Sequence, residues 1–310
     1  MELTAQPDIG PLPFLARSAY SESTPMQIED GRRLASARLH ALRSAFNGVG
    51  KMLEFKVLGA LEVLENGRVC TPTPPKVLRV LALLLLRANR VVPIETLVEE
   101  LWGDNPARTA VTTTQTYIYQ VRKLIDRDRS GTDEELLVTK WPGYMLRLPA
   151  GALDADTFEA LVTQGRTHLE QGRAAEAAPI LHQALNLWTD LPLANVPQGT
   201  ILATHTQSLM EQRLRAIELR IQADSQLGRH VELIGELREL IAEYPFNEWL
   251  HEQLISALNH AGRRSDALLA YQEIRSTLHT ELGLEPSTQL QRLQHEVLSN
   301  QPVRVSRLKA

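Results

Sequence analysis

The first regular pattern in the chain is a strand-like alternation of apolar and polar side chains over Leu53–Leu64. Asn66-Gly67 follows it, a dipeptide that favours a two-residue hairpin turn because both residues tolerate a positive φ. Arg68–Cys70 then supplies the returning strand. The pattern predicts a β-hairpin at the start of the ordered chain.

Two apolar helices are predicted next. Lys76–Ala88 is heavily apolar, and Pro74 and Pro75 stand where proline commonly opens a helix. Ile94–Trp102 is shorter and is followed by Gly103. Glycine is favoured just beyond a last helical turn because it adopts left-handed backbone without strain.

A third helix is predicted over Asn105–Asp126, and its two faces differ. At about 100° per residue, one dry stripe is formed by Val111, Thr114, Ile118, Val121 and Ile125. The opposite face carries Thr109, Thr112, Thr113, Thr116, Tyr119, Gln120 and Lys123. Threonine is a poor helix former, so this exposed face favours a surface that contacts phosphates and base edges. An ordinary amphipathic helix with a solvated face stays open as the alternative, because the segment alone does not separate the two.

The following segment predicts a second hairpin. After a polar loop over Asp128–Glu135, Leu136–Leu148 reads as two strands joined at Pro142-Gly143. Strands, three helices and a terminal hairpin are the order of a winged helix, in which the second and third helices form the helix-turn-helix and the hairpin forms the wing. We therefore assign residues 52–150 to a winged-helix domain.

The rest of the chain is predicted to be almost entirely helical over residues 154–298. Helices end at three Gly-Arg pairs that begin at Gly172, Gly228 and Gly262, and the last two lie 34 residues apart, the tetratricopeptide period. The Pro-rich segment Asp190–Thr200 interrupts the array. The predicted fold class is thus an α+β winged helix-turn-helix domain followed by an all-α tetratricopeptide-like solenoid domain at 151–300.

Length and composition indicate the number of domains and the cellular compartment. With 310 residues and 43% hydrophobic content, the chain can form two domains that each have a core. The single Cys70 excludes an internal disulfide framework, which fits a reducing cytoplasm. The longest apolar run, Val80–Leu86, is far shorter than the ~20 residues that cross a bilayer, and the N-terminus lacks a secretory apolar region.

Both ends of the chain lack a sustained pattern. Residues 1–51 mix Pro, Ser and Gly, which predicts a disordered extension, and residues 301–310 form a C-terminal tail. Regular pattern begins at Met52, so translation could itself start there.

Charge is distributed unevenly along the chain. Residues 52–150 carry 13 Lys and Arg against 12 Asp and Glu, whereas residues 151–310 carry 14 against 20. A protein with a formal net charge of -4 can still bind nucleic acid if its basic groups gather on one face. Net charge therefore does not decide the function.

In a helix-turn-helix, the N-terminal half of the last helix faces the bases. Hydroxyl, amide and methyl groups that can reach base edges are expected at Thr112, Thr113, Thr116, Tyr119 and Gln120. Arg122 and Lys123 are better placed for phosphates, and Arg108 could take either role.

Further contacts are expected at the wing and at the end of the second helix. Lys140 and Tyr144 flank the wing turn and would reach phosphate or the minor groove. Trp141 fits both packing and DNA contact, and Trp102 fits both core packing and an indole N–H bonded to phosphate.

Several patches in this order resemble one family. FKVLGALEV, PPKVLRVLALLLLRANRVV, LVEELWG, QTYIYQVRKLI and WPGYMLRLP are similar to the OmpR-type domain of the Streptomyces antibiotic regulatory proteins (SARP). The helical half resembles the bacterial transcriptional activation domain of that family, so the resemblance covers about residues 52–298. Two departures stand out: the third helix is richer in threonine than OmpR-type helices, and residues 1–51 contain none of the patches that carry the resemblance.

The resemblance implies a cytoplasmic, nucleoid-associated transcriptional activator, often specific to one antibiotic gene cluster. It implies binding to direct repeats near promoters and contact with RNA polymerase holoenzyme. The helical half is expected to supply protein contacts, which serve either a homodimer on DNA or recruitment of the polymerase. Phosphate contacts are implied at Lys76, Trp102, Arg122 and Lys140, and base contacts along Thr113–Gln120. With the second half removed, the winged helix is expected to keep some DNA binding and to lose activation.

Other function classes find little support. The chain has no phosphate-binding G-x-x-x-x-G-K-[ST] loop, its histidines do not cluster at metal spacing, and no nucleophile lies beside a base. His251 and His260 are expected to be solvated surface residues. We therefore expect a protein that is not an enzyme and needs no cofactor.

A tetratricopeptide-type scaffold is the alternative function, with a winged helix that docks protein rather than DNA. The salt dependence of duplex binding distinguishes the DNA-binding function from the scaffold, because affinity for duplex DNA falls log-linearly with salt concentration.

Overall fold

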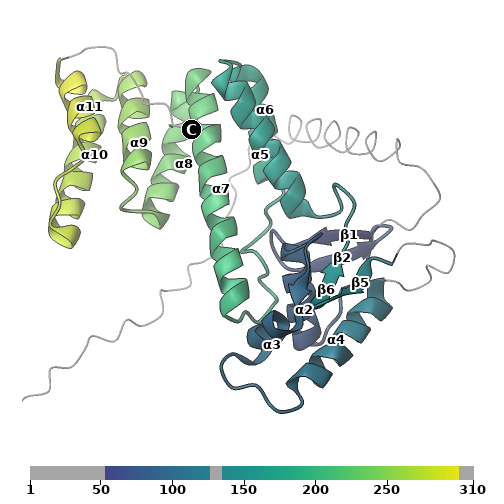
Figure 1. Ribbon diagram of the computed structural model, residues 1–310. Helices are drawn as coiled ribbons and strands as arrows, with labels where there is room; N and C mark the ends of the chain where they lie inside the picture. Colours follow the sequence, from purple (N-terminus) through teal and green to yellow (C-terminus); the bar gives the residue numbers. More distant parts are fainter. Residues whose placement is uncertain (1–52, 126–134, 300–310) are drawn as a thin grey trace, which may run out of the picture. The chain divides into compact units, whose positions relative to one another are not determined.

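The computed structural model describes residues 53–125 and 135–299 of the chain (Figure 1). The predicted extension 1–51, the tail 301–310 and most of the loop Asp128–Glu135 lie outside these described residues. Within them, no helix is long and apolar enough to span a membrane.

The N-terminal hairpin is confirmed, with one correction. Strands β1 (Leu53–Lys56), β2 (Glu62–Glu65) and β3 (Arg68–Val69) form an antiparallel sheet in the order β1-β2-β3. Asn66 and Gly67 join β2 to β3 with φ values of 51° and 79°, as a tight hairpin requires. The expected continuous strand Leu53–Leu64 is instead divided, because residues 57–61 turn away to bond with the helical half of the chain.

Three helices follow as predicted. Helix α2 (Pro75–Leu86) is buried along most of its length, and α3 (Ile94–Trp102) ends at Gly103, whose φ is 62°. Helix α4 (Ala110–Ile125) packs against both α2 and α3. These helices form the core of the winged-helix half.

The third helix differs from its prediction at its start. It begins at Ala110 rather than near Asn105, because every side chain from Gly103 to Thr109 is exposed and gives an extra turn nothing to pack against. Val111, expected on the dry stripe, is 48% exposed. Buried Ala110 takes its place beside Thr114, Ile118, Val121 and Ile125.

The predicted wing is present. Strands β5 (Leu137–Lys140) and β6 (Gly143–Leu146) form an antiparallel hairpin, and β6 also pairs with the short β4 (Val92–Pro93). At Gly143 the two backbones approach so closely that a Cβ would lie 1.9 Å from the Val92 carbonyl oxygen. This register therefore requires glycine at position 143.

The second half is helical and tetratricopeptide-like, as expected. The Gly-Arg pairs are helix junctions: Gly172, Gly228 and Gly262 have φ values of 74°, 78° and 75°. The elements are α5 (Asp154–Glu170), α6 (Ala174–Leu185), α7 (Thr200–Gln226), α8 (His230–Glu243), α9 (Glu248–His260), α10 (Arg264–Thr277), the π-helical η1 (Leu278–Leu282) and α11 (Thr288–Ser299).

The buried side chains do not divide at residue 151. One hydrophobic cluster joins Phe55 and Leu81 of the winged helix to Phe158, Trp188 and Leu202 of the helical half. A second cluster lies among α7–α11. The winged helix therefore shares its core with the first helices of the second half, where the sequence predicted a separate core for each domain.

Two histidines differ in their surroundings. His251, expected at the surface, is 7% exposed, and its Nε2 lies 3.1 Å from the carbonyl oxygen of Pro245. Burial lowers its pKa. His260 is exposed as expected, and its ring stacks on His230 with centroids 4.2 Å apart. The prediction for His251 was wrong because helical periodicity cannot show that α9 packs between α8 and α10.

Asp154, the first residue of α5, makes polar contacts between the two halves. Its carboxylate accepts hydrogen bonds from the backbone N–H of Val57 at 2.9 Å and of Leu58 at 3.1 Å. Asn195 makes a second such contact by accepting from the N–H of Leu61 and donating to its carbonyl. Burial raises the pKa of Asp154 to about 6, although the backbone hydrogen bonds oppose this shift.

This raised pKa predicts a pH-dependent stability. Because the folded chain holds the proton more tightly than the unfolded chain, the contribution is complete below pH about 4 and is lost as pH rises through about 6. Asp154→Asn removes the titration. In urea unfolding at a series of pH values, the free energy of unfolding of the wild type should therefore fall relative to Asp154→Asn across this window. A constant difference would contradict the prediction.

Candidate nucleic-acid interface

The outer face of α4 is mostly neutral and polar. No carboxylate occurs in the helix, and its basic side chains lie in the last turn. The exposed positions are Val111, Thr112, Gln115, Thr116, Tyr119, Gln120 and Lys123. Of the predicted base-facing residues, Thr112, Thr116, Tyr119 and Gln120 thus share this face, whereas Thr113 is half-buried at its edge.

Two threonines of α4 donate hydrogen bonds from their hydroxyls to its backbone. Thr114 donates to the carbonyl of Ala110 at 2.8 Å in the core, and Thr116 donates to the carbonyl of Thr112 at 3.1 Å on the surface. This i–4 bond leaves the Thr116 methyl group and the hydroxyl lone pairs available for an external contact.

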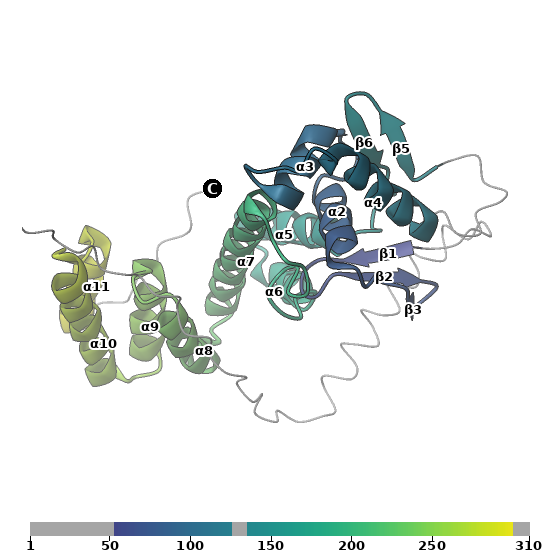
Figure 2. The ribbon, with the colours of Figure 1, turned by 90° about the horizontal axis from the view of Figure 1, so that it is seen from below.

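Arg122 ties α4 to the wing. Its guanidinium donates to the carbonyl of Leu137 at 3.2 Å and to the hydroxyl of Thr139 at 3.1 Å. Figure 2 shows α4 beside the β5–β6 hairpin. The predicted phosphate role of Arg122 stays a prediction, and in this structure the side chain fixes the wing to the helix.

Lys76 of α2, Trp102 of α3 and Tyr117 of α4 form a stack. The Lys76 Nζ lies 4.4 Å from the centroid of the Trp102 ring, and the rings of Trp102 and Tyr117 stack with centroids 6.5 Å apart. The two predicted residues Lys76 and Trp102 thus lie together, on the first turn of α2 and the last turn of α3. Their contact orients the ammonium group through a cation–π attraction.

The wing tip presents an aromatic side chain to solvent. Trp141 is 92% exposed, so the packing alternative for this residue finds no partner among the described residues. Lys140 beside it is also exposed, whereas Tyr144 is half-buried in β6 opposite Thr139. The remaining predicted residue, Arg108, is exposed in the loop before α4.

Two surface residues were outside the predicted set. Gln115 lies on the exposed face of α4 and could have been found by extending the same helical period from Thr112. Tyr117 is half-buried and becomes relevant only through its stacking on Trp102, which depends on how α3 and α4 cross. Among the described residues, no group of three or more His, Cys, Asp or Glu is arranged to hold a metal ion.

Two family models match the chain. The one described as "Transcriptional regulatory protein, C terminal" matches residues 68–146, and the "Bacterial transcriptional activator domain" matches residues 153–298. Both describe transcriptional regulation rather than enzymatic chemistry.

Individual proteins match over most of the chain. It is 39% identical to the regulatory protein DnrI of Streptomyces peucetius, over 81% of this chain and 93% of DnrI. It is 35% identical to the regulatory protein AfsR of Streptomyces coelicolor, over 81% of this chain and 24% of AfsR. The solved structure of Mycobacterium tuberculosis EmbR in complex with a low-affinity phosphopeptide matches with a TM-score of 0.78 and 32% identity, over 83% of this chain and 67% of that one.

Proposed function

Because the chain belongs to the family of Streptomyces antibiotic regulatory proteins, we propose that it activates transcription by binding direct repeats of double-stranded DNA near a promoter. In this proposal α4 enters the major groove and the wing contacts the neighbouring backbone or minor groove. The observation that carries it is the exposed face of α4, which is free of carboxylates and flanked by the exposed wing tip.

The side chains of this face suit the two kinds of contact that DNA binding needs. Gln120 can bond to adenine with two hydrogen bonds, and the Thr112 and Thr116 methyl groups can contact thymine. Lys123 and Lys140 can neutralise phosphates without reading sequence. The exposed Trp141 indole would add an apolar contact at the groove edge.

We further propose that the chain acts in the cytoplasm, where it recruits RNA polymerase holoenzyme to genes of an antibiotic pathway. A homodimer on adjacent repeats would match the repeated operator. The helical half, with its excess of acidic residues, would supply the protein contacts.

Paired substitutions test the DNA face. Lys140→Ala should weaken binding to every duplex and reduce the slope of log K against log salt by about one, because one phosphate contact is lost. Gln120→Ala should instead cost roughly 1–3 kcal/mol at particular base pairs. Electrophoretic mobility shifts over a salt series, with footprinting of promoters, measure both effects.

Matched controls lie on the exposed surface of α5. Arg166→Ala removes one positive charge and Gln164→Ala removes one amide, both away from α4, so neither should alter binding. An unchanged footprint and base preference in Gln120→Ala would show that α4 does not face the bases. Absence of salt-dependent duplex binding in the wild type would favour the alternative function, a protein-docking scaffold.

A further inference from the structure

Helix α7 lacks a cap of its own. It spans 27 residues, or about 40 Å at the usual helical rise, and begins after Gly199, which has no side chain to accept a hydrogen bond. Its first turn also contains no acidic residue. The unpaired N–H groups and the positive end of the helix dipole therefore need a partner from elsewhere.

Glu100, on helix α3 of the helix-turn-helix, supplies that partner. Its carboxylate accepts hydrogen bonds from the backbone N–H of Gly199 at 2.6 Å, of Ile201 at 3.1 Å and of Leu202 at 3.0 Å. Only 2% of Glu100 is exposed. A residue of the winged helix thus caps a helix that begins about a hundred positions later in the chain.

Two neighbours complete this joint. Arg79 lies 3.7 Å from the carboxylate and donates to the carbonyl of Pro197 at 2.7 Å and to that of Glu100 at 3.2 Å. At Gly199, a Cβ would lie 2.5 Å from the Glu100 carbonyl oxygen and 2.7 Å from its Oε1. Glycine at the cap position therefore permits the approach of α3.

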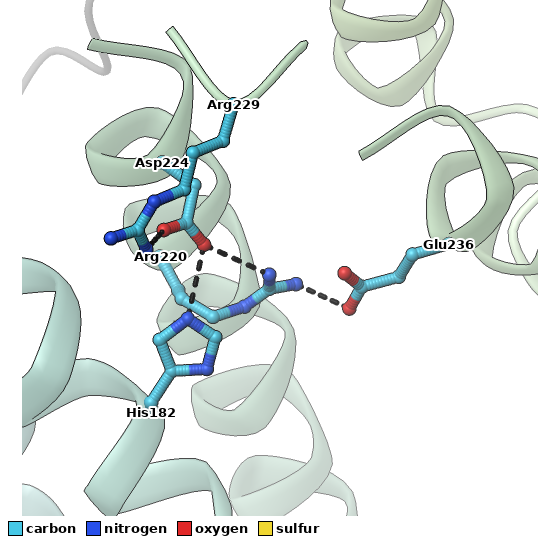
Figure 3. A network of polar contacts seen from close by, with 5 residues as sticks. All are labelled: His182, Arg220, Asp224, Arg229 and Glu236. Atoms are coloured by element: carbon cyan, nitrogen blue, oxygen red, sulfur yellow. Dashed lines mark hydrogen bonds and ion pairs between the residues drawn. The ribbon is translucent and has the colours of Figure 1, made fainter. Parts of the chain in front are cut away.

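The other end of α7 is tied to its neighbours by a second polar cluster (Figure 3). The Asp224 carboxylate contacts Arg220 at 3.2 Å, Arg229 at 2.8 Å and His182 of α6 at 3.1 Å. Arg220 also pairs with Glu236 of α8. Helix α7 is thus held at its first turn by α3 and near its last turn by α6 and α8.

We propose that Glu100 is a positioning residue: by capping α7, it fixes the orientation of the distal helices α8–α11 relative to the helix-turn-helix. Its value for activation rests on the proposed function, because a fixed orientation on DNA would direct the distal helices to a defined side of the promoter. The orientation itself can be measured without DNA.

The experiment measures a distance across the full-length chain. Spin labels are placed at Gln115→Cys on α4 and Gln272→Cys on α10, both exposed, in a Cys70→Ser background, and double electron–electron resonance gives the distance distribution. Glu100→Gln keeps the size of the side chain but turns an amide NH2 group towards N–H donors. The distance distribution of Glu100→Gln should be severalfold wider than that of the wild type. The control Glu99→Gln, at the adjacent exposed position, should keep the narrow distribution of the wild type.

A second readout links orientation to function. On a duplex with one repeat, Glu100→Gln should bind with an unchanged salt slope, yet transcription from the promoter should fall by about tenfold. If the wild type bound no duplex, the proposed function would fail while the distance result stood. If Glu100→Gln folded and kept a narrow distribution, or if Glu99→Gln widened equally, the positioning role would be wrong.

Arg79→Lys keeps the proposal testable if Glu100→Gln does not fold. It preserves the charge near Glu100 but removes the guanidinium fork that reaches Pro197 and Glu100. An intermediate broadening of the same distribution is expected, and a wild-type distribution would contradict the proposal.

Discussion

A chain that ends at Ala150 is expected to lose cooperative folding, although it contains every element of the winged helix. Its core would lose Phe158, Trp188, Leu193 and Leu202, which belong to the same cluster of buried side chains as Phe55. Removal of one large buried side chain typically costs about 2–5 kcal/mol, and a whole domain is stable by only about 5–15 kcal/mol. Several such losses exceed the available stability.

Backbone hydrogen bonds would be lost as well. The N–H of Phe55 donates to the carbonyl of Ala152 at 2.8 Å, and the N–H groups of Val57 and Leu61 donate to Asp154 and Asn195. Loss of the hydrogen-bond partners of these three buried residues adds to the cost. This revises the expectation that the winged helix alone keeps some DNA binding.

Thermal unfolding followed by circular dichroism tests this prediction. The chain 52–150 should show no cooperative transition and no specific duplex binding. The chain 52–228, which keeps α5, α6 and the whole of α7, retains the first hydrophobic cluster and should unfold cooperatively. A sharp transition in the chain 52–150, near that of the longer chain, would contradict the shared core.

The features that the sequence predicts correctly are those with a local cause. Asn66-Gly67 fixes a hairpin because two adjacent residues accept a positive φ, and Gly103, Gly228 and Gly262 end helices for the same reason. The exposed face of α4 follows from helical periodicity, so most of the candidate DNA contacts could be placed on one surface. Their roles in binding stay predictions.

The features that sequence analysis missed depend on partners far away in the chain. Glu100 and Gly199 are 99 positions apart, and Asp154 is 97 from Val57. Helical periodicity places Glu100, but not Glu99, on the buried stripe of Leu97 and Leu101, yet it cannot show that this carboxylate meets the first turn of α7. The same limit explains why Val111 was wrongly expected on the dry stripe of α4. Only the packing of α4 against α2 and α3 decides where that stripe begins.

The second large effect is expected at Asp224, which should be the most sensitive charged position in the helical half. Asp224 is 3% exposed and Arg220 is 4% exposed, so Asp224→Ala leaves a buried guanidinium with Glu236 as its remaining carboxylate partner. Removing one member of a buried ion pair typically costs about 3–5 kcal/mol. Urea unfolding should show a loss of that order.

Two further variants separate the possible causes of this loss. Glu236→Gln removes a carboxylate whose side chain is 43% exposed, so its cost should be much smaller. Arg220→Met combined with Asp224→Ala also removes the buried guanidinium and should recover much of the stability. Equal losses in the single and double variants would assign the effect of Asp224 to packing rather than to charge.

The pH dependence gives an independent check on the same site. Burial alone would raise the pKa of Asp224, but the hydrogen bond and charge of His182 and the charges of Arg220 and Arg229 outweigh it, so the pKa is lowered. A lowered folded-state pKa gives stability that is complete above the unfolded value of about 4 and is lost as pH falls through the folded value. The stability difference between the wild type and Asp224→Ala should therefore shrink as pH falls below about 4. A difference that grew on acidification would show that the folded chain does not favour the ionised carboxylate.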